Sequence, residues 1–175
     1  FKLRQKGMIY ALLVNSGDRQ GDLRHVRIGV EFVRDENGDW RHGIRQNKTG
    51  NKKELGLLWP GTSALIDQHI LGDRPVWQMQ TRLAEVEGLN LLTLSEKVVN
   101  EGYINRRLAQ DFKVHGHLVR TLIADLLRRV RPDALWALQH MLGHTNRTTQ
   151  RVYRSEFDES RAVMAFDDLY GQLSD

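Results

Sequence analysis

The spacing of apolar residues predicts that the chain begins with a helix. Apolar side chains recur about one helical turn apart, at Leu3, Met8, Leu12 and Leu13. This pattern predicts a helix over residues 3–14 that ends near Ser16-Gly17, because glycine often follows the last helical turn. A short second helix is predicted from about Gln20 to Arg27.

The period of the pattern then shortens to that of β-strands. Apolar residues from Val30 to Val33 lead into Asn37-Gly38, and Asn-Gly is the strongest short-range signal of a β-hairpin. The pattern predicts three strands and two turns: a strand ending near Val33, the Asn-Gly turn, a strand over 40–46, a turn over 47–52 and a strand over 54–59. We therefore expect an α+β fold, mainly α-helical, with a small three-stranded antiparallel sheet inserted near the N-terminal third.

Helical spacing dominates the rest of the chain. The helices that it predicts cover residues 62–71, about 95–110 with Ser95 as the N-terminal cap, 117–130, a segment from Pro132 to Gly143, 146–153 and a tail over about 156–173. Between His117 and Val130 the leucines form one apolar stripe, so the pattern predicts that this stripe faces the core. Residues 72–93 carry no clear pattern.

Composition limits the class of protein. The 175 residues are 40% hydrophobic, enough for one domain with its own core. The chain has no run of 18 apolar residues and no secretory signal at its start, so we expect a cytoplasmic protein. It has no cysteine, which excludes disulfides, thiolate nucleophiles and cysteine-bound zinc.

The net charge of +4 is unevenly distributed. Residues 155–175 contain six acidic residues and one arginine, a net charge of −5, so residues 1–154 carry +4 − (−5) = +9. A basic body with an acidic tail favours a polyanionic partner such as nucleic acid. The alternative is a mildly basic protein with no such partner.

Two sequence segments near the C-terminus could carry chemistry. Gly143 is placed to end a helix, which puts His144 in a loop, and Tyr153 follows nine residues later. His117 and Arg120 are three residues apart and share the helix face opposite the leucines, which points outward or into a cleft. Each feature alone is more typical of a packing tyrosine or a solvated helix end.

Two further segments lie in the first third of the chain. Arg19 follows Gly17-Asp18 at the predicted turn between two helices, where neighbouring backbone can hold its side chain. Lys48 lies in the second hairpin turn, from which a lysine could reach a DNA groove, and Lys52 and Lys53 compete with it for this role. Alone, each is more typical of a solvated surface residue.

Read together, the order and spacing of these residues resemble the tyrosine recombinases and phage integrases, the lambda-integrase-like family. The family's first box is similar to Gly17–Leu23, its HxxR box to His117–Arg120 and its last box to Leu142–Tyr153. The resemblance covers about residues 8–155, although residues 60–112 contribute almost nothing to it. Asp18 departs from the family, which usually has an apolar or small residue there, and it places a carboxylate beside Arg19.

The resemblance implies a metal-independent, cofactor-free catalytic domain over residues 1–175 that cleaves and rejoins DNA through a 3′-phosphotyrosine. In this scheme Tyr153 is the nucleophile, His117 the general base and Lys48 the general acid. The groups that stabilise the phosphate are Arg19, Arg120 and His144. It also implies double-stranded DNA as partner and a bacterial, nucleoid-associated location. An N-terminal DNA core-binding domain would be absent from this fragment. The tail would either pack on a neighbouring protomer on DNA or fold back on its own domain.

Other functions compete with this interpretation. Four histidines, His115, His117, His140 and His144, could provide nitrogen ligands for a zinc ion, although a glycine before His144 disturbs the helical spacing of the last two. A non-catalytic DNA-binding module could keep the same fold, but it would have no need for Tyr153. A DNA-relaxing enzyme of the type IB topoisomerase kind would use the same chemistry.

Overall fold

The structure is a computed structural model, and it describes residues 1–45 and 52–131. The chain divides into two compact units, Phe1–Ile123 and Ala124–Asp175. The described helices are α1 (Lys2–Ser16), α2 (Gln20–Leu23), α3 (Pro60–Leu71), the 3₁₀ helix η1 (Val76–Gln78), α4 (Met79–Val86), α5 (Tyr103–Phe112) and α6 (Gly116–Val130). The strands are β1 (Phe32–Arg34), β2 (Trp40–Arg45) and β3 (Lys52–Leu57). The expected α+β class with a three-stranded antiparallel sheet is therefore confirmed.

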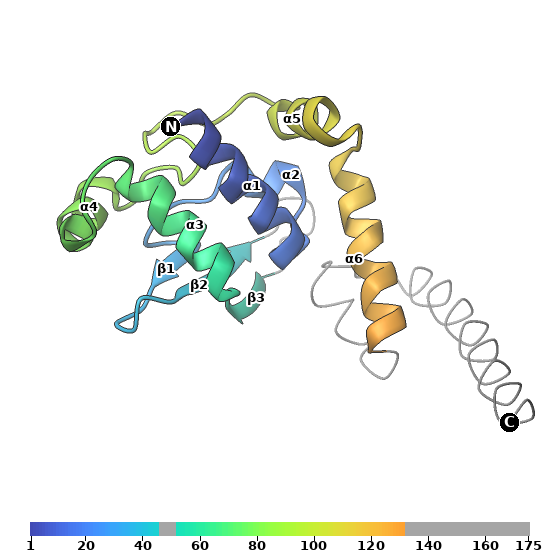
Figure 1. Cartoon of the computed structure of the whole chain (residues 1–175), viewed down its shortest axis with the longest axis horizontal. Helices are drawn as coiled ribbons and strands as arrows, with labels where there is room; N and C mark the ends of the chain where they lie inside the picture. The colour runs from blue at the N-terminus through green and yellow to red at the C-terminus, as the bar shows by residue number, and fades with distance from the viewer. Residues whose placement is uncertain (46–51, 132–175) are drawn as a thin grey trace, which may run out of the picture. The chain divides into compact units, whose positions relative to one another are not determined.

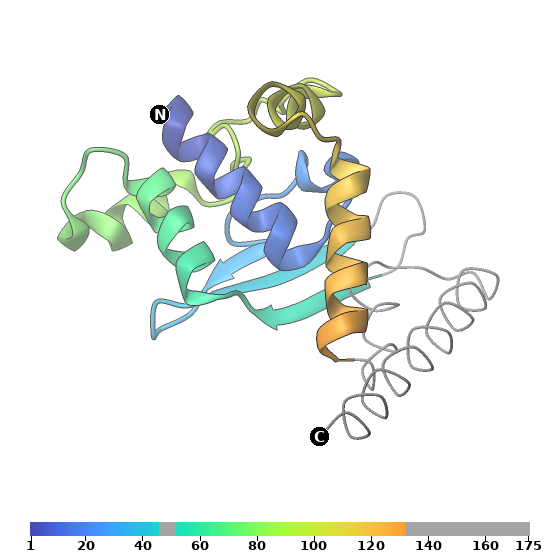
Figure 2. The same cartoon turned by 45° about the vertical axis from the view of Figure 1, so that its right-hand side comes forward.

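Helices α1 and α3 lie side by side over one face of the sheet (Figures 1 and 2). The core forms between these helices and the sheet, and its fully buried members include Met8, Ile9, Leu12, Ile66, Ile70, Phe32, Trp40 and Ile44. Burial of such side chains contributes about 1.5–3 kcal/mol each, so this layer provides the main stabilisation of the first unit. The helix predicted at residues 3–14 is α1, with its end where Ser16-Gly17 placed it.

The hairpin between β1 and β2 is the one that the Asn-Gly sequence predicts. The Asp35 carboxylate accepts hydrogen bonds of 3.0 Å from the backbone N–H groups of Asn37 and Asp39. Gly38 has a φ of 90°, which a side chain would disfavour. Local polar contacts and one glycine thus stabilise this turn.

The sheet has the order β1-β2-β3, and all of its pairs are antiparallel. An irregularity between His42 and Gly43 shifts the register of β2 against β3, and Ile44 then lies opposite Lys53. His42 alternates with the buried Trp40 and Ile44 along β2, and Lys53 lies opposite Ile44, so both of these polar side chains are buried, each 2% exposed. Strand alternation thus carries an imidazole and an ammonium group into the interior.

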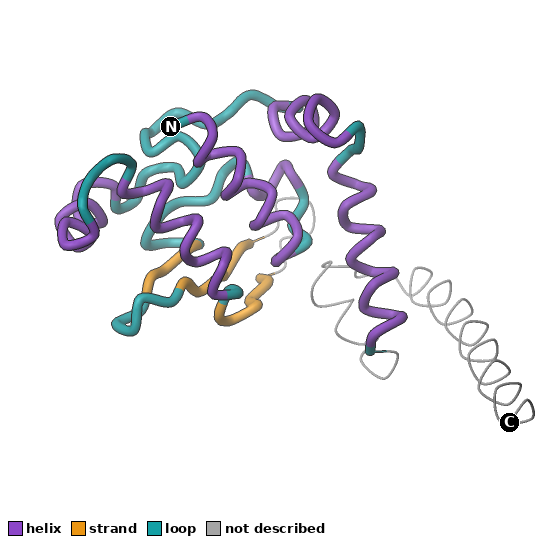
Figure 3. Tube along the Cα trace, in the orientation of Figure 1, coloured by secondary structure: helices purple, strands orange, loops and turns teal. Residues whose placement is uncertain are grey.

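Helix α5 begins at Tyr103, so the expected helix start at Ser95 is wrong. Residues 87–102 form a long loop, coloured teal between α4 and α5 in Figure 3. Asn90 fixes this loop, because its side-chain N–H donates to the Arg24 carbonyl at 2.7 Å and its backbone N–H donates to the Ser95 carbonyl at 3.0 Å. Contacts with a distant part of the chain therefore override the local capping signal.

The orientation of α6 also differs from the prediction. Leu118 and Leu122 are 43% and 56% exposed, whereas Arg120, on the face predicted to be polar, is buried. The guanidinium can be buried because it donates a hydrogen bond to the backbone carbonyl of Gly17. The prediction that the leucine stripe faces the core is therefore wrong at these two leucines.

Candidate functional site

The turn between α1 and α2 provides the framework of the candidate site. Gly17 ends α1 in the left-handed conformation, with a φ of 60°, and its N–H donates to the Leu13 carbonyl at 3.0 Å. Arg19 follows in an extended conformation and immediately precedes α2. Its side chain is half-buried. The glycine thus reverses the chain and sets the direction in which Arg19 leaves the backbone.

Two cations from distant parts of the chain bind the carbonyls of this turn. The Lys53 ammonium on β3 donates to the Ser16 carbonyl at 2.5 Å. The Arg120 guanidinium on α6 donates to the Gly17 carbonyl at 2.5 Å, across 103 positions of sequence. These charge-assisted bonds join β3 and α6 to the turn that carries Arg19.

The Asp18 carboxylate, in the same turn, is only 1% exposed, and its partners come from β2 and β3. One oxygen accepts a hydrogen bond of 2.7 Å from Nε2 of His42, and the other contacts the Lys53 ammonium at 2.7 Å. Burial by itself raises the pKa of Asp18, but the His42 hydrogen bond and the Lys53 charge outweigh it and lower the pKa to about 2. Asp18, the residue at which the sequence departs from the recombinase pattern, thus has a hydrogen-bonding partner on each of its oxygens.

Lys53 is a structural cation rather than a substitute for Lys48. Its ammonium has three hydrogens, and two of them are directed at Ser16 and Asp18 within the protein. Burial lowers the pKa of Lys53, against the opposing effect of the Asp18 carboxylate. A buried lysine held in this way has little freedom to reach a leaving group on DNA.

Helix α6 also meets the first turn of α2 through a shared amide. The Asn105 side-chain oxygen on α5 accepts hydrogen bonds from the Gln20 amide at 2.7 Å and from the Gly116 backbone N–H at 3.0 Å. A Cβ atom at Gly116 would lie 2.0 Å from the Gln20 amide nitrogen, so this approach requires glycine or displacement of Gln20. The contact fixes the start of the helix that carries His117 and Arg120.

The structure brings together part of the predicted set. Arg120 bonds to the turn from which Arg19 projects, and His117 lies exposed one turn earlier on the same helix. The other three predicted residues, Lys48, His144 and Tyr153, lie outside the described residues. Sequence reasoning missed His42 altogether and treated Lys53 only as a competitor of Lys48. The strand alternation contains a signal for both, but only once the register is known.

A histidine-based metal site has no support in the described part of the chain. Within residues 1–45 and 52–131, no three histidine, aspartate or glutamate side chains gather as a metal ion would require. His140 and His144, half of the proposed ligand set, lie outside these ranges.

Among the described helices, none is both long and apolar enough to cross a membrane.

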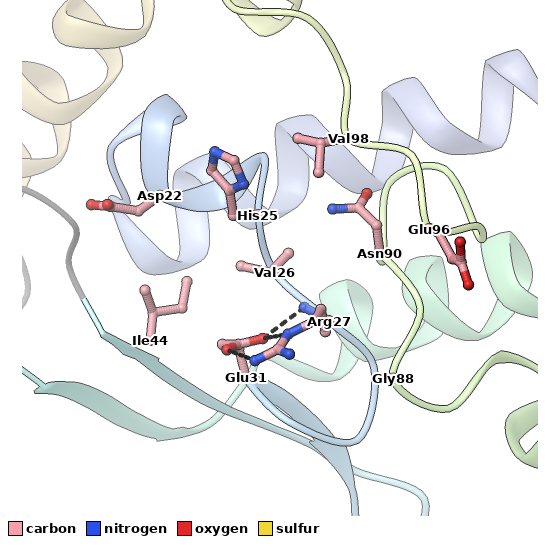
Figure 4. Close-up of a pocket in the computed structure, with 10 residues that line it drawn as sticks. All are labelled: Asp22, His25, Val26, Arg27, Glu31, Ile44, Gly88, Asn90, Glu96 and Val98. Carbon is pink, nitrogen blue, oxygen red and sulfur yellow. Dashed lines mark hydrogen bonds and ion pairs between the residues drawn. The ribbon is translucent and has the colours of Figure 1, made fainter.

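A separate hollow of about 680 Å³ lies beside α2 (Figure 4). Its lining includes three carboxylates, Asp22, Glu31 and Glu96, and one arginine, Arg27, which already forms an ion pair with Glu31 at 3.1 Å. Such a lining disfavours a phosphate because the negative charges outnumber the positive one. The hollow is therefore a poor candidate for a polyanion site.

No protein-family model matches the chain, and no curated protein matches it.

Proposed function

We propose that the protein is a site-specific DNA recombinase that cleaves and rejoins DNA strands through a 3′-phosphotyrosine on Tyr153. The observation that carries the proposal is the bond from Arg120 to the Gly17 carbonyl. It joins two segments that the sequence resemblance selected independently and that are far apart in the chain. The Arg120 guanidinium is thereby anchored at the turn from which Arg19 leaves the backbone, on a body whose net charge favours a polyanion.

Arginine suits the chemistry of this proposal. Attack on a phosphodiester increases the charge on its non-bridging oxygens, and fixed donors aimed at these oxygens stabilise the transition state. Arg19 and Arg120 provide permanently charged, planar donors, and His144 adds a further one. Loss of one such preorganised donor typically costs about 3–4 kcal/mol in the transition state.

The proposed step balances without a metal or a nucleotide. The Tyr153 phenol oxygen bonds to phosphorus, and the bond from phosphorus to the 5′-oxygen breaks. His117 accepts the phenol proton, and Lys48 protonates the departing 5′-oxygen. Ionising a free phenol at pH 7 costs about 4 kcal/mol, and neighbouring guanidiniums reduce this cost. The phosphotyrosine keeps the bond energy for religation.

The proposed setting is the one that the resemblance to tyrosine recombinases implies. The substrate is double-stranded DNA in the bacterial cytoplasm, and the enzyme associates with the nucleoid when bound. Recombination requires more than one protomer on DNA, and the acidic tail over about 156–173 is the proposed contact between them. Integration of a mobile element or phage genome is the process that this activity serves.

The test is covalent capture on DNA of unknown target sequence. The chain is incubated with a pool of nicked duplexes that carry a randomised core, so that a cleaved strand loses its short 5′-hydroxyl fragment and cannot religate. Denaturation in detergent then leaves only covalent adducts. We expect wild-type adducts that share a core sequence and a phosphotyrosine that mass spectrometry maps to Tyr153. The Tyr153→Phe variant should bind DNA but give no adduct.

Tyr103→Phe is the matched control, because it also removes one phenol oxygen, here one that bonds to Gln5 at 2.7 Å. It should form adducts. DNA binding by all three proteins should weaken with salt, with a log–log slope of about −0.9 for each neutralised phosphate. An adduct from Tyr153→Phe would reject Tyr153 as nucleophile. Adducts without a shared sequence, together with plasmid relaxation, would indicate the topoisomerase-like activity, and binding without any adduct would indicate a DNA-binding module.

A further inference from the structure

Every residue of the Ser16–Asp18 turn is held by a side chain from elsewhere in the fold. Lys53 binds the Ser16 carbonyl, Arg120 binds the Gly17 carbonyl, and Lys53 and His42 bind the Asp18 carboxylate. These contacts come from β2, β3 and α6. The turn is thus the point to which both the sheet and α6 are hydrogen-bonded.

Core stability alone does not explain the polar content of this point. Removing two charges from water is costly, and apolar residues of similar volume are often as stabilising as a buried ion pair. Asp18 and Lys53 are nevertheless at most 2% exposed. What an ion pair provides and an apolar contact does not is direction, because each hydrogen bond is satisfied only in a narrow geometry.

The direction of these bonds matters for the arginines. Asp18 is the residue immediately before Arg19, so any rotation of the turn also rotates the backbone from which the Arg19 side chain starts. Lys53 bridges Asp18 and the Ser16 carbonyl, and it therefore fixes both ends of the turn. The Gly17 carbonyl lies between them and orients the Arg120 guanidinium.

We propose that Asp18 is a positioning residue: through Lys53 and His42 it locks the Ser16–Asp18 turn and so aligns the Arg19 and Arg120 guanidiniums on a common phosphate. This inference rests on the proposed function for the phosphate, but the alignment of Arg120 is a property of the folded chain. Asp18 itself does not touch DNA in this scheme. A misplacement of about 1 Å in such donors can lower a rate about 100-fold, so the alignment has a kinetic signature.

Two substitutions at Asp18 separate positioning from folding. Asp18→Asn keeps the shape of the side chain but removes the charge that holds Lys53. The double variant Asp18→Leu/Lys53→Met removes both buried charges and leaves an apolar contact, so it should fold even if Asp18→Asn does not. The matched control is Asp73→Asn, which makes the same change in net charge on a side chain that is 94% exposed and pairs with Arg4.

The first measurement needs no DNA. In the ¹⁵N-labelled chain, the bond from Arg120 to Gly17 slows rotation of the guanidinium and keeps its two Nη signals separate; the spectrum of Arg120→Lys assigns these signals. We expect separate signals in wild type and Asp73→Asn, and merged signals in Asp18→Asn and the double variant. Separate signals in a folded Asp18 variant would overturn the proposal.

The second measurement is the single-turnover rate of adduct formation on a nicked duplex recovered from the randomised pool. In Asp18→Asn and the double variant we expect a rate about 10- to 100-fold below that of Asp73→Asn, with DNA affinity within about 2-fold. Equal rates per folded molecule would overturn the proposal. If wild type itself gives no adduct, the proposed function fails, and the Arg120 signals still decide whether Asp18 holds the turn.

Discussion

His69 and Asp18 are both buried polar side chains, and each is 1% exposed. His69, on α3, uses one ring nitrogen to donate to the Leu91 carbonyl at 3.0 Å. Its other nitrogen, Nδ1, has no hydrogen-bond partner among the described residues. Burial lowers the pKa of His69 to about 4, so at neutral pH the ring is uncharged.

Asp18 is buried to the same extent, but its pKa shifts so that the charged form is favoured. It remains charged, because His42 and Lys53 each satisfy one of its oxygens and lower its pKa to about 2. His69 keeps its one hydrogen bond in the uncharged form, whereas Asp18 keeps its charge together with a partner from each of two strands. The difference teaches that the buried charge is concentrated at the turn that bears Arg19, and not in the core as a whole.

The largest effect should come from removing the charge on one side only. Asp18→Leu leaves the Lys53 ammonium buried without its carboxylate, and we expect the free energy of unfolding to fall by about 3–5 kcal/mol. Adding Lys53→Met should recover most of this loss, because no uncompensated charge remains. At the uncharged site, His69→Gln should cost only about 1 kcal/mol.

Urea unfolding at pH 7, followed by circular dichroism, measures all of these variants. The comparison between the two sites would break if Asp18→Leu cost no more than His69→Gln. The comparison would also fail if adding Lys53→Met lowered the stability of Asp18→Leu further. That result would mean that the buried Lys53 charge does not depend on the Asp18 carboxylate.

The pH dependence of stability provides the next effect. The pKa of His69 is about 4 in the folded chain and near its ordinary 6.5 when unfolded, so protons bind more readily to the unfolded chain. Stability is therefore complete above pH 6.5 and declines as the pH falls to 4, by about 3 kcal/mol. His69→Gln keeps an amide donor but cannot be protonated, so this decline should be absent. Unfolding midpoints at pH 7.5 and pH 4 test it, and an equal decline in the variant would assign the effect to other groups.

Much of the fold could be predicted because its signals are local. The end of α1 at Gly17, the Asn37-Gly38 hairpin and the three strands follow from spacing and turn chemistry within a few residues. The helix expected from Ser95 fails because Asn90 ties the same segment to Arg24, a contact between distant residues that no local pattern contains.

The candidate site could be predicted only as far as residue type and order carry it. Arg19 and Arg120 were selected from the sequence, and the structure joins Arg120 to the turn of Arg19. The inward position of Lys53 depends on the shifted register between His42 and Gly43, which single-strand alternation does not reveal. The sequence shows Asp18 only as a departure from the recombinase pattern, because its partners lie on β2 and β3, far along the chain.

The smaller of the two pH effects belongs to Asp18 itself and lies in a separate pH range. Its pKa is about 2 when folded and 3.8 ordinarily, so its carboxylate is harder to protonate in the folded chain. The stability that it contributes is present above pH 3.8 and is lost as the pH falls to 2, by about 2 kcal/mol. Unfolding measured at pH 4 and pH 2 should show this loss in wild type and in Asp73→Asn, but not in Asp18→Asn. Because most of the His69 loss occurs above pH 4, the two ranges overlap little. A loss that persisted in Asp18→Asn would mean that the charge on Asp18 is not what holds the turn.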